Sequence, residues 1–385
     1  MRKAIKLGFI LVAASMLIGC GGGSSGDGVA NDSGNGGGGG NGSTGGFANE
    51  FKARSIGDQV EELLDGIIII ADEVGSGKMG DPLGESIDKA DTTLVESQFS
   101  WNSTMDFYNN IKGINEVWHG GLKGIVNASQ PEEAEEITTI IDEALASIVA
   151  ISDYDGDGKL ETEDLIAEDG LMAFRQQILN EDGRKKIQNA IDKILSLRDK
   201  IEKLKGQINP TNEHLTLAAK VVDEVIVSNY EKLSYRATTL LEKLTELKNN
   251  PSADTVKAAR DAWRATRIPW ERSEAYLFGP VDTLGVDPKV DSWPVQKDQL
   301  DGALGGYDPE LSNIDGFPVN MKGFHAIEYL LFGDGTTLEP AEDAAARLQT
   351  PVDEEPASDK LRLVYLEALG KSLQKDLQSL VDAWK

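Results

Sequence analysis

A histidine and a glutamate lie three residues apart in the apolar stretch that runs from Gly323 to Gly333. This spacing places His325 and Glu328 on one face of a helix. The chain has only three His, and an imidazole beside a carboxylate is costly to bury unless a partner such as a metal ion satisfies it. The pair therefore indicates part of a metal site, although the same spacing also occurs in ordinary buried helices.

The first twenty residues have the pattern of an exported lipoprotein. Residues 1–6 are basic, and the apolar run 7–18 that follows is too short to span a bilayer comfortably. Small residues precede Cys20, as in the bacterial lipobox. We therefore predict that residues 1–19 are a signal peptide and that Cys20 is lipidated.

A glycine- and serine-rich segment follows Cys20. Residues 20–46 carry too few apolar side chains to offset the entropy of ordering, so they should form a flexible tether, with the folded body starting near Phe47. We expect a globular body held in the bacterial cell envelope by a lipid, periplasmic or associated with the outer membrane. Gly21 argues mildly against retention at the inner membrane.

Composition limits the chemistry further. Thirty-eight basic and 65 acidic residues give a net charge of −27, which disfavours nucleic acid as a partner and raises the local concentration of cations. Cys20 is the only cysteine, so the mature body has neither disulfides nor thiolate metal ligands. Any metal ion must be held by oxygen and imidazole.

Helical periodicity dominates the chain from Asp58 onward. Apolar residues recur at three- and four-residue spacing, and no segment alternates convincingly as a strand. Breaks are expected at residues 75–77, 209–210 and 249–251. The predicted fold is all-α, with two packed four-helix-like bundles at 47–207 and 208–385 and a ligand or metal cleft between them.

Three blocks of sequence resemble the imelysin family of bacterial envelope proteins. The first is Gly-x-His-x-x-Glu at residues 323–328, and the second runs from Trp263 to Val281 and continues in residues 290–294. The third block contains Glu-Ser-x-Phe-Ser at residues 96–100, and in the usual family order it follows the histidine helix. Here it comes first, so the resemblance implies a circularly permuted order of the two bundles.

The resemblance implies an envelope protein involved in iron uptake that binds a metal ion or a metal-containing ligand. Iron, zinc and manganese all suit histidine and carboxylate ligands. The expected ligands are His325, Glu328, Glu274 and Glu96, with Ser97 and Arg267 as orienting hydrogen-bond partners. The identity of the ligand, whether free metal, siderophore or haem, is left open.

Catalysis is a separate question, because the family takes its name from a reported metallopeptidase activity. The His-Glu-x-x-His pattern of zinc peptidases, which supplies two ligands and a general base, is absent here. We therefore favour binding over catalysis and assign no catalytic residue. The alternatives are a zinc metallopeptidase and an accessory protein that interacts with an outer-membrane transporter.

A second metal motif lies at residues 153–164, which match an EF-hand calcium loop. The glycine at the sixth position and the leucine at the eighth fit that loop, and helical patterns flank it. The twelfth residue is Asp where Glu usually supplies two oxygens, so affinity should be modest and the role structural. The expected Ca²⁺ positions are Asp153, Asp155, Asp157, Lys159, Glu161 and Asp164.

Overall fold

The computed structural model describes residues 46–152, 174–304, 314–351 and 361–385. Across these ranges the chain is helical and contains no strand, which confirms the all-α prediction. None of the helices there is both long enough and apolar enough to cross a bilayer. Cys20 and the predicted calcium loop at 153–164 lie outside the described residues.

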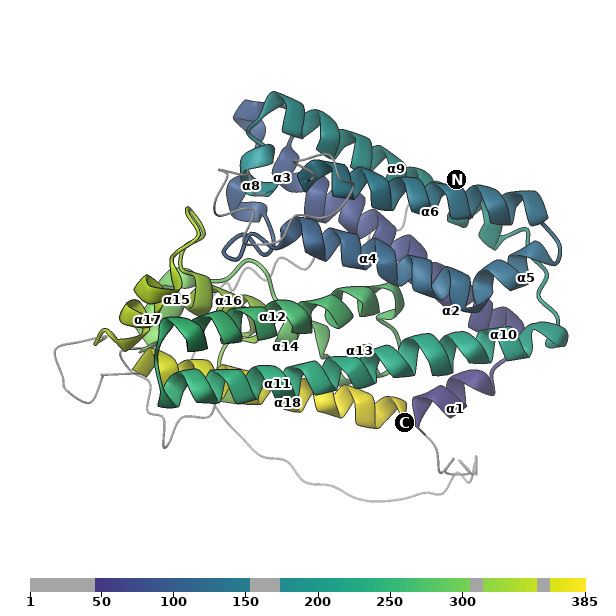
Figure 1. The fold of residues 1–385 in the computed structure, drawn as a ribbon. Coiled ribbons are helices and arrows are strands. Elements are labelled where there is room, and N and C mark those ends of the chain that lie inside the picture. Colours follow the sequence, from purple (N-terminus) through teal and green to yellow (C-terminus); the bar gives the residue numbers. More distant parts are fainter. Residues whose placement is uncertain (1–45, 153–173, 305–313, 352–360) are drawn as a thin grey trace, which may run out of the picture. The chain divides into compact units, whose positions relative to one another are not determined.

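Four long helices pack against one another in the first half of the chain (Figure 1). They are α2 (Ile56–Asp72), α4 (Ser103–Val117), α6 (Pro131–Ser152) and α9 (Glu181–Lys205). Side chains cap two of them, since Ser55 accepts a hydrogen bond from the backbone of Asp58, and Asn180 accepts from the first turn of α9. Their apolar faces meet in a common core.

A second group of helices comes from the C-terminal half. It comprises α11 (Ser228–Asn249), α12 (Ala253–Ser273), α16 (Gly323–Phe332), α17 (Ala341–Gln349) and α18 (Leu361–Trp384). A capping box of Ser252 and Thr255 starts α12, and α12 also packs against α4 of the first group. These contacts confirm a fold of packed helical bundles, while the predicted boundary at residue 207 stays a prediction.

Short helices connect the long ones. The α-helical connections are α1 (Phe47–Lys52), α3 (Asp81–Leu83), α5 (Lys123–Asn127), α8 (Phe174–Gln177), α10 (Leu215–Lys220), α13 (Pro280–Leu284), α14 (Asp287–Val290) and α15 (Lys297–Leu304). The 3₁₀ turns are η2 (Ile87–Lys89), η3 (Thr92–Leu94), η5 (Asn212–His214), η7 (Glu274–Tyr276), η8 (Ile314–Gly316) and η9 (Val319–Met321). The π-helical segments are η1 (Glu73–Gly80), η4 (Trp118–Leu122) and η6 (Val221–Val227).

The expected break at residues 75–77 is wrong, because the chain continues there from α2 into the π-helix η1. Gly75 has a packing role: a Cβ atom at this position would lie 2.7 Å from the side chain of Leu195 on α9. The glycine therefore permits close helix contact. Continuing the helix also carries Lys78 to a buried position, and π-helical turns are frequent at functional sites.

The two ends of the folded body lie side by side. The backbone N–H of Gly46 donates to the carbonyl of Lys385 at 2.8 Å, and the rings of Phe47 and Trp384 are 5.0 Å apart. Adjacent ends are the geometry that circular permutation requires. The permuted order itself stays a prediction.

Candidate metal centre

Helix α16 begins at Gly323, a position where any residue other than glycine would be strained. Gly323 has φ +72°, and a Cβ atom there would lie 2.2 Å from the carbonyl oxygen of Val290. The missing side chain lets the start of α16 press against the segment that ends α14. This close approach brings Asp291 next to His325, which lies two residues into the helix.

His325 is fully buried, and Glu328 holds one side of its ring. The Nδ1 atom lies 2.8 Å from Glu328 Oε2, which confirms that the two residues share a helix face. The other oxygen of Glu328 accepts hydrogen bonds from both the backbone N–H and the hydroxyl of Ser100, each at 2.8 Å. Glu328 thus fixes the ring orientation and directs Nε2 away from the helix.

The Nε2 atom of His325 faces two further carboxylates. It lies 3.1 Å from Asp291 Oδ1 and 3.5 Å from Glu96 Oε1, yet no described residue meets it in hydrogen-bond geometry. One ligand atom from each of these three residues falls within 4.8 Å of the others. An imidazole nitrogen and two carboxylate oxygens at this separation can converge on one metal ion.

The same carboxylates also change the pKa of His325. Burial by itself lowers the pKa of this imidazole, but Asp291, Glu328 and Glu96 outweigh burial and raise the pKa well above its usual value. The carboxylates therefore favour positive charge at Nε2. A bound metal ion would supply that charge in place of the proton.

The turn that carries Glu96 is strained. Ser97 and Trp101 have φ values of 49° and 61°, a conformation that costs energy for residues other than glycine. The turn presents Ser100 to Glu328, while the hydroxyl of Ser97 donates to Asp106 Oδ2 at 2.5 Å. Ser97 therefore orients Asp106 on α4, and its predicted role as a hydrogen-bond partner of the metal ligands stays a prediction.

Arg267 of α12 is fully buried among carboxylates. Its Nη2 atom lies 2.9 Å from Glu96 and 3.1 Å from Asp106, and the guanidinium also contacts Glu271 and Asp291. One side chain thus touches two of the three carboxylates nearest His325. Arg267 keeps these anions in place without itself being able to lose its proton.

Lys78 occupies a second position within the acidic cluster. Its Nζ atom lies 2.8 Å from Glu274, 3.2 Å from Glu96 and 3.7 Å from Glu271. Asn110 Nδ2 donates to the same oxygens of Glu274 and Glu271, at 2.6 and 2.7 Å. The structure therefore places Glu274 beside Lys78 and outside the group of ligand atoms around His325.

The buried network carries more acids than bases. Five buried carboxylates, Glu96, Asp106, Glu271, Glu274 and Glu328, and the partly buried Asp291 surround two cations, Lys78 and Arg267. The formal balance is −6 + 2 = −4, or −3 when His325 is protonated. Burial raises the pKa of Glu271 to about 8 and that of Glu274 well above its usual value. The network thus retains protons unless a cation replaces them.

Four members of this network were not predicted as site residues from the sequence. They are Lys78, Asp106, Glu271 and Asp291. One signal was present, because Glu271 follows Arg267 by four residues on the same helix, a spacing that favours an ion pair. Asp291 lies in the family block at residues 290–294, but nothing there pointed to His325, since the approach of the two residues depends on the contact between Gly323 and Val290.

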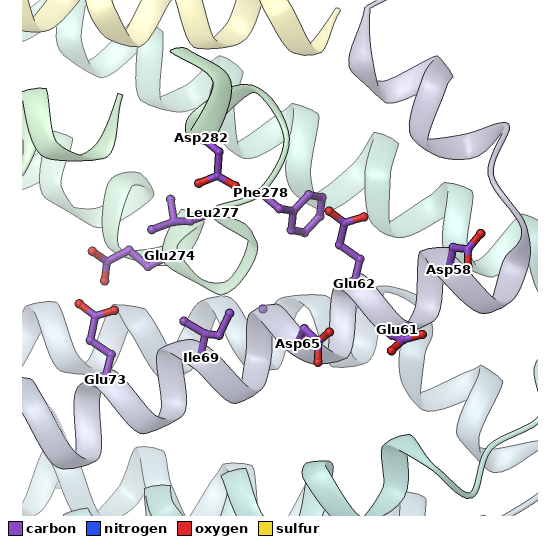
Figure 2. Close-up of a pocket in the computed structure, with 11 residues that line it drawn as sticks. Asp58, Glu61, Glu62, Asp65, Ile69, Glu73, Glu274, Leu277, Phe278 and Asp282 are labelled. Atoms are coloured by element: carbon purple, nitrogen blue, oxygen red, sulfur yellow. The ribbon is translucent and has the colours of Figure 1, made fainter. Parts of the chain in front are cut away.

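An acidic pocket opens beside the network, with a volume of about 450 Å³. Carboxylates from α2 line one side, and Figure 2 shows Glu73 and Glu274 pointing toward one another across it. Ile69, Leu277 and Phe278 supply apolar surface. Glu274 belongs to both the pocket and the buried network, so it connects the two. The acidic lining residues are Asp58, Glu61, Glu62, Asp65, Glu73, Glu274 and Asp282.

Comparisons with known proteins agree with this architecture. The crystal structure of an imelysin peptidase from Bacteroides ovatus is 27% identical, with a TM-score of 0.64 over 77% of this chain and 86% of that one. Iron-regulated protein A of Synechococcus elongatus is 35% identical over 164 residues, which are 43% of this chain. The match spans only 38% of that relative's length.

A putative iron-regulated protein A precursor from Parabacteroides distasonis is 30% identical over 42% of each chain, with a TM-score of 0.35. The family model for imelysin matches residues 37–201 and 226–385, which include the histidine helix, the Arg267 helix and the Glu96 turn. This match covers most of the sequence. The chain therefore belongs to the imelysin family.

Proposed function

We propose that this protein is an iron-related envelope protein that binds a transition metal ion at His325, Glu96 and Asp291. The observation that carries the proposal is the Nε2 atom of His325. It is buried, lacks a hydrogen-bond partner among the described residues, and lies within 3.5 Å of both carboxylates. Two carboxylates this close favour a positive charge at Nε2, which either a proton or a bound metal ion supplies.

In this proposal, Glu328 and Glu274 do not bind the metal ion directly. Each has a different role. Glu328 has its two oxygens engaged by His325 and Ser100, so it serves best as the carboxylate that orients a metal-bound histidine. Glu274 faces the acidic pocket and Lys78, where it is suited to receive an incoming cation. Arg267 holds Glu96 and Asp291 in place.

The ligand set suits iron, zinc or manganese, since these ions accept imidazole and carboxylate together. Iron is our choice because the curated relative from Synechococcus elongatus is named an iron-regulated protein. That similarity spans less than half of each chain, so iron is the metal to test first. The proposed envelope location, periplasmic or associated with the outer membrane, rests on the signal-peptide and lipidation pattern that ends at Cys20.

Metal analysis of the purified mature protein tests the centre. The wild type should retain transition metal after dialysis, whereas His325→Ala, Asp291→Asn and Glu96→Gln should each lose most of it. His119→Ala is the matched control, because His119 is exposed and is not one of the residues of the buried network. Equal metal content in all five proteins would overturn the proposal.

Glu328→Gln separates the two roles proposed for that residue. A positioning carboxylate should weaken metal affinity by about 10–100-fold when changed, because second-shell partners have effects of that size. Loss of binding as complete as in His325→Ala would instead identify Glu328 as a direct ligand. Metal titration followed by equilibrium dialysis measures the difference.

The alternative function is peptidase activity, as in the name of the Bacteroides ovatus protein. Incubation of the metal-loaded protein with an unfolded protein substrate tests it directly. We expect no cleavage, because Glu328, the acidic residue nearest His325 on its helix, is bound to His325 and Ser100. Cleavage that disappears in His325→Ala would establish the enzyme.

Calcium binding at residues 153–164 belongs to the same proposal as a separate, structural site. Its support is the match of the sequence to an EF-hand loop. Calcium should raise the melting temperature of the wild type and leave that of Asp153→Ala unchanged. Identical responses of the two proteins would exclude this site without affecting the metal centre at His325.

A further inference from the structure

A second cavity, which we call the Trp293 pocket, has the opposite electrostatic character from the acidic pocket. Its volume is about 190 Å³. Two basic residues from distant parts of the chain, Arg175 of α8 and Lys297 of α15, line it together with Gln98 and Trp293. Among the described residues, Asp334 is the one acidic residue in its lining. The Trp293 pocket thus offers several donors and an excess of positive charge.

Two of these donors are buried without a partner. The Nη1 atom of Arg175 and the Nε1 atom of Trp293 are inaccessible to solvent, and no described residue accepts a hydrogen bond from either. Buried donors are nearly always satisfied in folded proteins. Both donors belong to side chains that line the same cavity, so a rotation of these side chains would bring the donors to an acceptor held there.

The acidic residue of the pocket does not supply that acceptor. Asp334 Oδ1 already accepts from the backbone N–H of Thr336 at 2.9 Å and from its hydroxyl at 2.7 Å. These hydrogen bonds lower the pKa of Asp334, so it stays ionised. Its Oδ1 atom is engaged by Thr336 in the same turn. Arg175 and Lys297 against Asp334 leave a formal charge of +1 in a chain whose total is −27.

We propose that the Trp293 pocket binds a small oxyanion, most suitably a carboxylate. A carboxylate has two oxygens in one plane, which match the parallel N–H donors of a guanidinium. Trp293 and Gln98, which also line the cavity, each carry a further N–H donor. One carboxylate group of such a ligand balances the net charge of +1 in the pocket, and the cavity volume of about 190 Å³ limits the size of the ligand.

The side chain of Trp293 connects the pocket to His325 of the proposed metal centre. The Trp293 ring packs against the His325 ring at 4.9 Å between centroids, in an edge-on arrangement. An anion in the pocket would therefore lie one ring away from His325. Anion binding does not depend on the proposed metal, but if both occur, a carboxylate ligand carried with the metal would find its own donors beside the centre.

Isothermal titration calorimetry with citrate tests the pocket in the metal-free mature protein. The wild type should bind citrate, and Arg175→Gln and Lys297→Gln should each weaken binding by about tenfold, which corresponds to about 1.4 kcal/mol. Arg175→Lys should lose less, because it keeps the charge but not the planar fork. Lys185→Gln is the control, since that lysine is exposed and pairs with Asp182 alone among described residues.

Inorganic phosphate serves as the second probe and separates the two sources of oxyanion. Tighter binding of citrate than of phosphate supports the carboxylate, and the reverse order replaces it with phosphate as the class of ligand. Trp293→Phe removes the indole donor while keeping an aromatic ring against His325, so it should weaken citrate binding without removing bound metal. Thermal melts verify that each variant is folded.

Two results would overturn the inference. One is an absence of citrate and phosphate binding to the folded wild type at millimolar concentration. The other is binding that is equally strong in Arg175→Gln, Lys297→Gln and wild type. Repeating the titration on metal-loaded protein keeps the proposals distinguishable, because citrate binding that requires metal and disappears in His325→Ala would place the anion on the metal and not in the pocket.

Discussion

The acidic pocket and the Trp293 pocket differ in both charge and construction. In the part of the chain that the structure describes, seven carboxylates and no basic residue line the acidic pocket, and most of these carboxylates come from one helix, α2. The Trp293 pocket combines side chains from several segments, with two cations against one anion. The difference shows that a net charge of −27 does not set the local field, which depends on which side chains packing brings together.

The buried network touches both pockets. Glu274 belongs to the acidic pocket and to the network, while Trp293 lines the other pocket and packs on His325. In the two proposals, a cation and an anion would thus bind at separate places next to His325. The comparison predicts that changes in the network affect both pockets, whereas changes in one lining affect that pocket alone.

The largest effect is expected from Arg267→Met, which removes the cation shared by four carboxylates. Leaving such charges buried without a partner costs about 3–5 kcal/mol of unfolding free energy. Urea denaturation at neutral pH measures it. Arg198→Met is the control, since the Arg198 ion pairs lie near the surface and such pairs contribute about 0–1 kcal/mol. Equal losses of unfolding free energy in the two variants would show that Arg267 does not stabilise the buried carboxylates.

The next effect is a pH dependence of the metal-free protein. Burial raises the pKa of Glu271 from 4.5 to about 8, so the folded state holds a proton that the unfolded chain releases above 4.5. The stabilisation from this proton is complete below pH 4.5 and is lost as pH rises through 8. Glu271→Gln should flatten this part of the stability profile. A profile that is already flat in the wild type would contradict the assignment.

Added metal should reduce the loss of stability that occurs as pH rises through 8. A cation bound only by the folded state stabilises it by mass action and replaces the proton as counter-charge. Chemical denaturation at pH 8 with and without metal provides the measurement, and His325→Ala is the variant in which metal should have no effect.

A smaller effect is expected from Gly323→Ala. The new Cβ atom would lie 2.2 Å from the Val290 carbonyl, at a φ of +72°, and strain of this kind costs about 1–3 kcal/mol. Because Gly323 sets the approach of Asp291 to His325, metal affinity should fall while citrate binding changes less. Gly302→Ala is the control: Gly302 lies in α15 with open space around it, so alanine there should stabilise the protein.

The smallest effect is expected from Asp282→Asn in the acidic pocket. Asp282 is exposed, so its charge acts mainly by attracting cations to the pocket. Metal association should slow by roughly twofold at low ionic strength and by less at high salt. Stopped-flow mixing measures the rate. Citrate binding should not weaken, and if it did, the two pockets would not be electrically independent.

Much of the architecture was predictable because it depends on local sequence. The apolar periodicity identified the all-α fold, and the spacing of His325 and Glu328 placed them on one helix face, as their 2.8 Å contact confirms. The break expected at residues 75–77 was wrong because the glycine serves close packing against Leu195. The helix propensity of glycine reflects the flexibility of the local chain. It contains no information about a side chain from another helix that packs against the glycine.

The candidate site was less predictable, and Asp291 and Ser100 illustrate why. Ser100 donates to Glu328 across 228 residues of sequence, and Asp291 reaches His325 only because Gly323 has no side chain. Neither contact leaves a periodic signal. The Trp293 pocket was also not identified, since Arg175 and Lys297 are ordinary basic residues until packing encloses them in one cavity.

The sequence by itself determined the helical elements, the acidic balance, the absence of thiolate ligands and the family signature around His325, because these depend on residue type and short-range spacing. Only the tertiary structure decided which carboxylates approach Nε2, which cations accompany them and where a positive pocket forms. The physical reason is that burial and electrostatic fields act through space, and their sources here lie on segments that are distant in the chain.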